Sequence, residues 1–184
     1  LSPILEEIPE GMGSRRPVTV LEGRIELNQV HFTYDAERPD VLDGIQLHVE
    51  PGEYIGITGA SGCGKSTLLR ILLGFEKPQS GTVAYDSQEM SGLELRSLRS
   101  RMGVVLQNDM LFAGDIYSNI AVCAPWITIE DAWNALERVG IAEDVRAMPM
   151  GIFTILSEGG GGLSGGQRQL LLIARAMVSH PDIV

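Results

Sequence analysis

The sequence contains little cysteine, little positive charge and no long apolar run. Its two cysteines, Cys63 and Cys123, are too few for a disulfide framework, which favours a reducing compartment. Asp and Glu number 24 against 14 Lys and Arg, a formal net charge of −10, which disfavours a protein that grips nucleic acid through its phosphates. The longest apolar stretches, such as residues 170–174, fall far short of the ~18 residues that cross a membrane.

Glycine, in contrast, is abundant. An average usage of roughly 7% predicts about 13 glycines in a chain of this length, and there are 22. Nine of them lie within residues 59–64 and 159–166. This clustering indicates two backbone segments that approach a ligand closely.

The apolar pattern predicts an α/β core of about one domain, with a helical insertion after about residue 107. Strands are expected at residues 24–34, 45–49, 54–58, 82–85 and 103–106. Helices are expected at residues 66–73, 128–140 and 164–178. Two of these helices have capping-box patterns, formed by Thr128 with Asp131 and by Ser164 with Gln167.

The two ends of the chain have the character of internal segments. Residue 1 is Leu, and residues 1–20 contain three prolines and no clear period, so we expect a linker there. Residues 182–184 have the pattern of the first residues of a buried strand. We therefore expect the 184 residues to be a piece of a longer protein.

The first glycine cluster fits the phosphate-loop motif G-x-x-x-x-G-K-[ST] between a predicted strand and a predicted helix. Such a loop turns backbone N–H groups toward an anion, and the helix start adds its positive dipole end. Lys65 supplies charge to the β- and γ-phosphates, and the Ser66 hydroxyl is placed for Mg²⁺. Cys63 is either a reactive thiol beside Lys65 or, as we prefer, a small residue where nothing larger fits. The predicted ATP-binding residues of this phosphate loop are Gly59, Ala60, Ser61, Gly62, Cys63, Gly64, Lys65, Ser66 and Thr67.

The second glycine cluster also precedes a helix start. Ser164 offers a hydroxyl, and Gly165 and Gly166 expose N–H groups beside a second helix dipole. Taken alone, this segment fits an ordinary capped helix equally well. We call residues 163–167 the signature segment; its members are Leu163, Ser164, Gly165, Gly166 and Gln167.

A phosphate loop followed about a hundred residues later by Leu-Ser-Gly-Gly-Gln resembles the nucleotide-binding domain of an ABC transporter. The resemblance covers nearly the whole chain. It implies a P-loop NTPase fold, with a mixed or parallel sheet and an antiparallel part, at residues 21–184, and a helical subdomain at about 108–180. It also implies ATP and Mg²⁺ as cofactors and a second nucleotide-binding domain as partner, homo- or heterodimeric, whose bound ATP meets the signature segment.

The resemblance assigns roles to two further residues. Tyr34 matches the aromatic residue that stacks on adenine, although a strand tyrosine packed in a core is the commoner case. Gln107 matches the glutamine that touches Mg²⁺ and the attacking water, which makes it a catalytic residue together with Lys65. The family's magnesium-binding Asp, catalytic Glu and switch His would lie beyond Val184. We therefore expect the full protein to be an ATPase and the 184-residue chain to hydrolyse ATP negligibly.

Residues 111–120 are similar to the exporter pattern Leu-Phe-x-Gly-(Ser/Thr)-Ile-x-x-Asn-Ile, with Asp115 in place of the hydroxyl residue. Glu158 matches the exporter loop that contacts the coupling helices, although a solvated acid fits it too. Residues 3–10, 106–108 and 146–151 most resemble bacterial exporters of bacteriocin-type peptides. The resemblance thus implies a transmembrane-domain partner and a place at the cytoplasmic face of the bacterial plasma membrane.

Two other classes stay open. DNA-repair and chromosome-maintenance ATPases share both glycine motifs, but they separate them by long coiled coils and their DNA grip fits the acidic charge poorly. A nucleotide-binding regulatory module without turnover is the other alternative, and a catalytic Glu after the last strand would exclude it.

Overall fold

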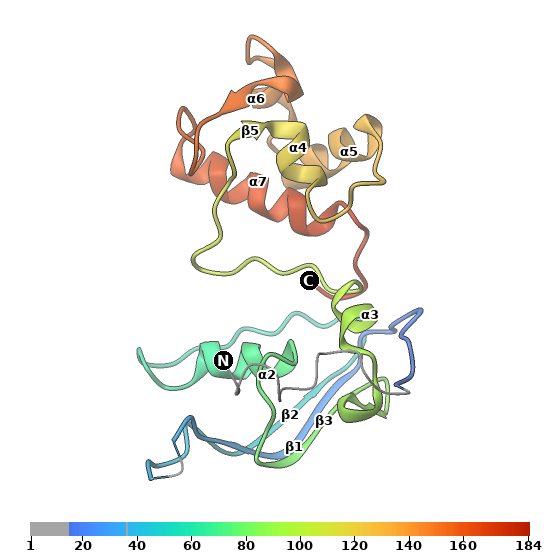
Figure 1. Ribbon diagram of the computed structural model, residues 1–184, viewed down its shortest axis with the longest axis vertical. Coiled ribbons are helices and arrows are strands. Elements are labelled where there is room, and N and C mark those ends of the chain that lie inside the picture. Colours follow the sequence, from blue (N-terminus) through green and yellow to red (C-terminus); the bar gives the residue numbers. More distant parts are fainter. Residues whose placement is uncertain (1–14, 36) are drawn as a thin grey trace, which may run out of the picture. The chain divides into compact units, whose positions relative to one another are not determined.

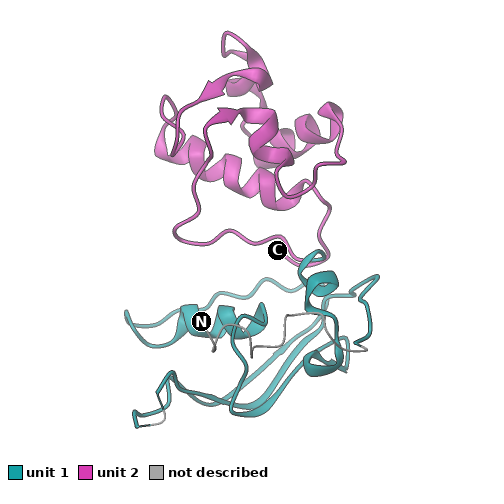
Figure 2. Ribbon diagram, viewed as in Figure 1, with its two compact units in different colours: residues 1–101 teal, residues 102–184 magenta. Residues whose placement is uncertain are grey.

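The computed structural model describes residues 15–35 and 37–184, which form two compact units (Figures 1 and 2). The first unit is Leu1–Arg101 and the second is Met102–Val184. Most of the predicted linker, including the exporter-like residues 3–10, lies outside the described residues. Among the described residues, no helix has the length and apolar character needed to span a membrane.

The first unit is built on an antiparallel sheet with the strand order β2-β1-β3-β4. Its strands are β1 (Ile25–Phe32), β2 (Leu42–Val49), β3 (Ser80–Tyr85) and β4 (Gln88–Glu89). Leu27 pairs with Leu47 on one side and with Val83 on the other, and both Leu27 and Val83 are buried. The alternation of apolar residues therefore predicted the strands at 24–34, 45–49 and 82–85 correctly.

One glycine fixes the fit between β1 and β3. Gly81 has a φ of +85°, and a Cβ there would lie 2.2 Å from the carbonyl oxygen of Gln29. Gln29 itself has a φ of 49°, and the pairing of β1 with both neighbours shifts register around it. The irregularity in β1 therefore requires a residue without a side chain opposite it.

Helix α2 (Lys65–Leu72) follows the phosphate loop and confirms the helix predicted at 66–73. It buries Thr67, Leu68 and Ile71, which lie on one face at helical spacing. The chain leaves the helix through Gly74, whose φ is +68°. A short 3₁₀ turn, η1 (Met90–Gly92), and helix α3 (Leu95–Arg99) complete the unit.

The strand predictions at 54–58 and 103–106 are wrong. Tyr54 is fully exposed, and Ile55, Ile57 and residues 104–106 are also exposed. Apolar character favours a strand only where a neighbouring backbone supplies ladder hydrogen bonds. In the described part of the chain, residues 54–58 have no such bond, and residues 103–106 have only the one that the Gly103 N–H donates to the Ile183 carbonyl at 2.8 Å. The antiparallel part of the expected mixed sheet is confirmed; parallel pairing among the described residues is limited to the isolated bridges Arg16↔Leu93 and Met102↔Ile183.

The second unit is mainly helical. Its elements are β5 (Gly114–Asp115), α4 (Ile116–Ala121), α5 (Ile129–Val139), α6 (Ala142–Arg146), η2 (Gly151–Phe153), β6 (Ile155–Leu156) and α7 (Gly165–Met177). The helices predicted at 128–140 and 164–178 are confirmed as α5 and α7, and both capping boxes are formed. The limits of a helical subdomain at about 108–180 stay a prediction.

The second unit has its own apolar core. Helices α4 and α5 both pack against α7 (Figure 1). The core residues come from all three helices and from the segments before and between them; they include Leu111, Ile116, Ile120, Ala132, Leu136, Ile141, Val145, Leu171 and Ala174. This packing holds the N-terminus of α7, and with it the signature segment, in a fixed place in the unit.

Candidate functional site

The phosphate loop adopts a conformation that only glycine tolerates. Gly62 and Gly64 have φ values of +81° and +93°. A Cβ at Gly64 would lie 2.8 Å from the carbonyl oxygen of Val41, so the loop is also packed tightly against the start of β2. The Leu68 N–H donates to the Gly64 carbonyl at 2.8 Å, and the N–H groups before it belong to the unpaired first turn of α2. These N–H groups can bind an anion.

The Lys65 ammonium lies over this loop. Its Nζ donates to the carbonyl oxygens of Gly59 at 2.9 Å and Ala60 at 2.8 Å, and lies 3.6 Å from the Cys63 Sγ. The neighbouring Ser66 is exposed at the helix start, where its hydroxyl is open to solvent. A cation, a hydroxyl and helix N–H groups thus surround one turn of backbone, and this donor set fits a nucleotide phosphate with Mg²⁺.

Tyr34 lies beside the phosphate loop. The residue is 59% exposed, and its hydroxyl is 3.3 Å from the Thr67 hydroxyl at the start of α2. The edge of the ring packs on Phe32, with centroids 4.8 Å apart and an interplanar angle of 89°. The alternative of a core tyrosine is therefore wrong, and an exposed aromatic residue lies next to the predicted phosphate site.

The signature segment presents a closed capping box to solvent. The Gln167 N–H donates to the Ser164 Oγ at 3.1 Å, and the Ser164 N–H donates to the Gln167 Oε1 at 3.0 Å. Ser164, Gly165 and Gly166 are exposed, while Leu163 is half-buried. The Ser164 oxygen accepts one hydrogen bond and keeps its own hydrogen for a ligand, beside the N–H groups of the first turn of α7.

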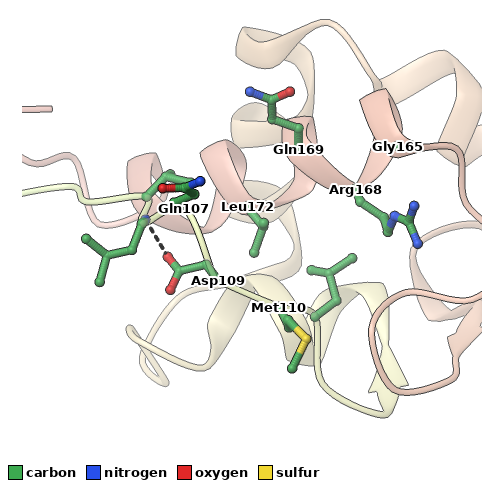
Figure 3. A pocket seen from close by; sticks show the side chains of 10 residues that line it. Gln107, Asp109, Met110, Gly165, Arg168, Gln169 and Leu172 are labelled. Atoms are coloured by element: carbon green, nitrogen blue, oxygen red, sulfur yellow. Dashed lines mark hydrogen bonds between the residues drawn. The ribbon is translucent and has the colours of Figure 1, made fainter. Parts of the chain in front are cut away.

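Gln107 lies in a tight turn, residues 106–109, which we call the glutamine turn. The Asp109 N–H donates to the Leu106 carbonyl at 3.1 Å, and the Leu106 N–H donates to the Asp109 carboxylate at 2.9 Å. The turn and the first half of α7 line one pocket of about 440 Å³ (Figure 3). Gln107, Gly165 and Arg168 all belong to that lining, so this structure brings the predicted glutamine and the start of the signature helix to one pocket.

Glu158 is exposed in the glycine turn that precedes the signature segment. The turn is closed by an antiparallel bridge between Ser157 and Gly161 and by the Gly160 N–H, which donates to the Ser157 carbonyl at 2.9 Å. A Cβ at Gly161 would collide with the Ser157 side chain. The turn is thus closed by its own backbone, and Glu158 is exposed on it; the coupling role of Glu158 stays a prediction.

Asp115, the departure from the exporter pattern, has a clear local role. It is the N-cap of α4, and its carboxylate accepts a hydrogen bond from the Ser118 N–H at 2.6 Å. A Ser or Thr at this position would cap through its hydroxyl in the same way. The carboxylate also places negative charge at the positive end of the helix dipole.

Sequence reasoning missed a polar network between the segment after the glutamine turn and α7. Asn119 is 3% exposed; its amide accepts from the Phe112 N–H and donates to the carbonyls of Phe112 and Asp115 at 2.8–3.0 Å. Arg175 donates to the Asn119 carbonyl, the Asn119 Oδ1 and the Met110 carbonyl at 2.8–3.1 Å. Partial burial lowers the pKa of Arg175 from its ordinary value. The two residues are 56 positions apart in the sequence, so only the fold identifies their side chains as partners.

Comparison with known proteins finds a family and several relatives that match this chain. The family model described as ABC transporter matches residues 42–184. The alpha-hemolysin translocation ATP-binding protein HlyB of Escherichia coli O157:H7 is 37% identical over 184 residues, which are 100% of this chain and 26% of HlyB. The cyclolysin secretion/processing ATP-binding protein CyaB of Bordetella pertussis strain Tohama I matches with the same identity and coverage.

A solved structure of a bacterial Atm1-family ABC exporter with ATP bound matches this chain with a TM-score of 0.88 and 32% identity. The match covers 98% of this chain and 32% of the exporter chain. The chain therefore spans about a quarter of the length of the curated relatives and about a third of the solved exporter.

Proposed function

The chain belongs to the ABC transporter family and has the fold of its ATP-binding domain, and on this premise we propose that it is the ATPase motor of a membrane exporter. In this proposal the whole protein couples binding and hydrolysis of ATP to transport. The observation that carries it is the pair of glycine-flanked helix starts, at α2 with Lys65 and at α7 with Ser164. A single helix start binds one anion, whereas two of different chemistry can hold one triphosphate from opposite sides.

Each predicted site residue of the first unit has its own role in this proposal. The N–H groups of the phosphate loop and the Lys65 ammonium bind the β- and γ-phosphates, and the Tyr34 ring stacks on adenine. The Ser66 hydroxyl is one of the proposed protein ligands of Mg²⁺. Bound Mg²⁺ would neutralise charge on the phosphate oxygens.

The second unit acts on the ATP of a second nucleotide-binding domain. Its Ser164 hydroxyl and Gly166 N–H donate to the γ-phosphate held by the partner's phosphate loop. Gln107 contacts Mg²⁺ and the attacking water, and Glu158 contacts the transmembrane domain at the cytoplasmic side of the membrane. These roles are supported by the exposure of Ser164, Gly166 and Glu158.

For the cargo we propose a leader-bearing peptide of the bacteriocin type. The names of the two relatives refer to alpha-hemolysin translocation and to cyclolysin secretion, which supports export and favours it over DNA repair. Transport of vesicle-encapsulated peptides by the reconstituted whole protein tests this part separately.

The deciding experiment is calorimetric titration of the whole protein with ATP and Mg²⁺, together with steady-state hydrolysis. Lys65→Ala should weaken ATP binding at least tenfold and abolish turnover, because the phosphates lose their only side-chain cation in the loop. Lys77→Ala is the matched control: it removes the other lysine of the chain, which is exposed outside the loop, and should change neither quantity.

Two outcomes contradict the proposal in different ways. Equal effects of the two lysine substitutions would remove the phosphate-loop assignment. Tight, Lys65-dependent binding without turnover in the whole protein would replace the motor by a regulatory nucleotide-binding module. The 184-residue chain by itself should show negligible hydrolysis in the same assay.

A further inference from the structure

The side-chain amide of Gln167 is held by two partners at once. Its Oε1 accepts from the Ser164 N–H at 3.0 Å, and its Nε2 donates to the Asp144 carboxylate at 3.0 Å. A backbone N–H only donates and a carboxylate only accepts, so both bonds require the same orientation of the amide. Asp144 lies on α6, 23 residues earlier in the chain.

The second partner fixes the geometry of the capping box. Rotation of the Gln167 amide would break the bond to the Ser164 N–H, and that bond closes the box. In the closed box the Ser164 oxygen also accepts from the Gln167 N–H, which leaves the hydroxyl hydrogen directed away from the helix. The carboxylate on α6 therefore acts, through one amide, on the direction in which the serine donates.

The ion pairs around Asp144 agree with this role of the Asp144 carboxylate. The neighbouring Glu143 and the nearby Glu137 are paired with Arg146, while Asp144 is directed to the signature segment. A free carboxylate close to a phosphate-binding helix start repels the phosphate. Accepting a hydrogen bond from Gln167 gives this carboxylate a structural role there.

From these contacts we infer that Asp144 is a positioning residue of the signature segment. It holds Gln167 so that the Ser164 hydroxyl points to the γ-phosphate of ATP bound by the partner domain. The inference rests on the proposed function. It adds Asp144, which lies outside the signature segment, to the residues that determine how this segment binds ATP. Since Asp144 acts through Gln167 in this inference, its loss should lower kcat and leave the ATP affinity of the phosphate loop unchanged.

Hydrolysis by the whole protein tests this with a compensating pair. Gln167→Glu sets two carboxylates against each other and should lower kcat about tenfold, without a matching change in KM for ATP. Adding Asp144→Asn should recover most of that loss, because the Asn Nδ2 then donates to one Glu oxygen while the other accepts from the Ser164 N–H. Asp144→Ala alone should lower kcat several-fold, and Glu143→Ala, the neighbouring control, should have no effect.

Amide hydrogen exchange supplies a readout that does not depend on turnover. In the whole protein, Asp144→Ala should speed exchange at Ser164 and in the first turn of α7, and Glu143→Ala should not. Equal exchange and equal kcat for the two alanine variants, or no recovery in the double variant, would overturn the inference. If the unmodified protein fails to hydrolyse ATP, the proposed function fails, and the exchange experiment still decides whether Asp144 positions Gln167.

Discussion

At the scale of single residues, Asn119 is the centre of a hydrogen-bond network in the second unit. One buried amide satisfies three backbone groups of the segment that leads from the glutamine turn to α4, and its oxygen also receives Arg175 from α7. Buried polar groups are costly when unpaired, so a network of this kind rigidifies only when each member is present. The sequence pattern at 111–120 marked the position of Asn119, but its partners became visible only in the fold.

Asn119→Ala should lower the free energy of unfolding by about 2 kcal/mol, because it leaves partly buried backbone groups and part of the Arg175 guanidinium without partners. Asn134→Ala is the control, since that side chain is exposed on α5. Denaturant unfolding of the two variants measures the difference. Equal stabilities would show that water replaces the lost bonds and that the network contributes little.

At the scale of elements, helices followed from the sequence more reliably than strands. The start of α5 at Thr128 and its end at Gly140 were predictable because the capping box and the left-handed glycine, with a φ of +80°, are local features. The segments at 54–58 and 103–106 were not predictable, because a strand needs a partner that can lie anywhere in the chain. Both segments are apolar, as a strand requires, but the hydrogen bonds of a strand depend also on the partner strand.

The capping box of α5 makes one contribution to stability depend on pH. Hydrogen bonds from the Thr128 N–H and hydroxyl hold the pKa of Asp131 below its ordinary value of 3.8. A lowered folded-state pKa adds stability above the unfolded-state pKa, and this stability is lost as the pH falls through the folded value. The stability difference between the unmodified chain and Asp131→Asn should therefore be present at about pH 6 and shrink steadily below about pH 4. A difference that stays constant over this range would show that the charge of Asp131 is irrelevant to the box.

At the scale of the whole molecule, each unit contains its own predicted nucleotide-binding element: the phosphate loop lies in residues 1–101 and the signature segment in residues 102–184. Both were readable from the sequence, because glycine, lysine and serine at fixed spacing are local signals. The supporting contacts from Asp144 and Arg175 were not, since they join residues 23 to 65 positions apart. Local motifs thus mark the positions of the predicted site residues, and tertiary packing determines how their side chains are oriented.

The core of the second unit permits a test at this scale. Leu136 is fully buried between α5 and its neighbours, and Leu136→Ala should lower the free energy of unfolding of this unit by about 3 kcal/mol. Hydrogen exchange should accelerate most in α5 and α7, which pack on each other. The exposed Leu69 on α2 serves as the control for a leucine truncation outside the core. Acceleration spread evenly over all 184 residues would contradict the view that the unit has a core of its own.

The position of the two tryptophans has an optical consequence. Trp126 and Trp133 both belong to residues 102–184; the first is 74% exposed, and the second lies under the Arg146 guanidinium at 5.0 Å. Three of the four tyrosines, including Tyr34, belong to the other unit. Excitation at the red edge of the tryptophan band, where tyrosine does not absorb, therefore yields the fluorescence of the second unit alone, from one exposed and one partly buried indole. An indole spectrum that stays constant during a nucleotide titration is consequently no sign that the phosphate loop is empty, because the emitters belong to the other unit.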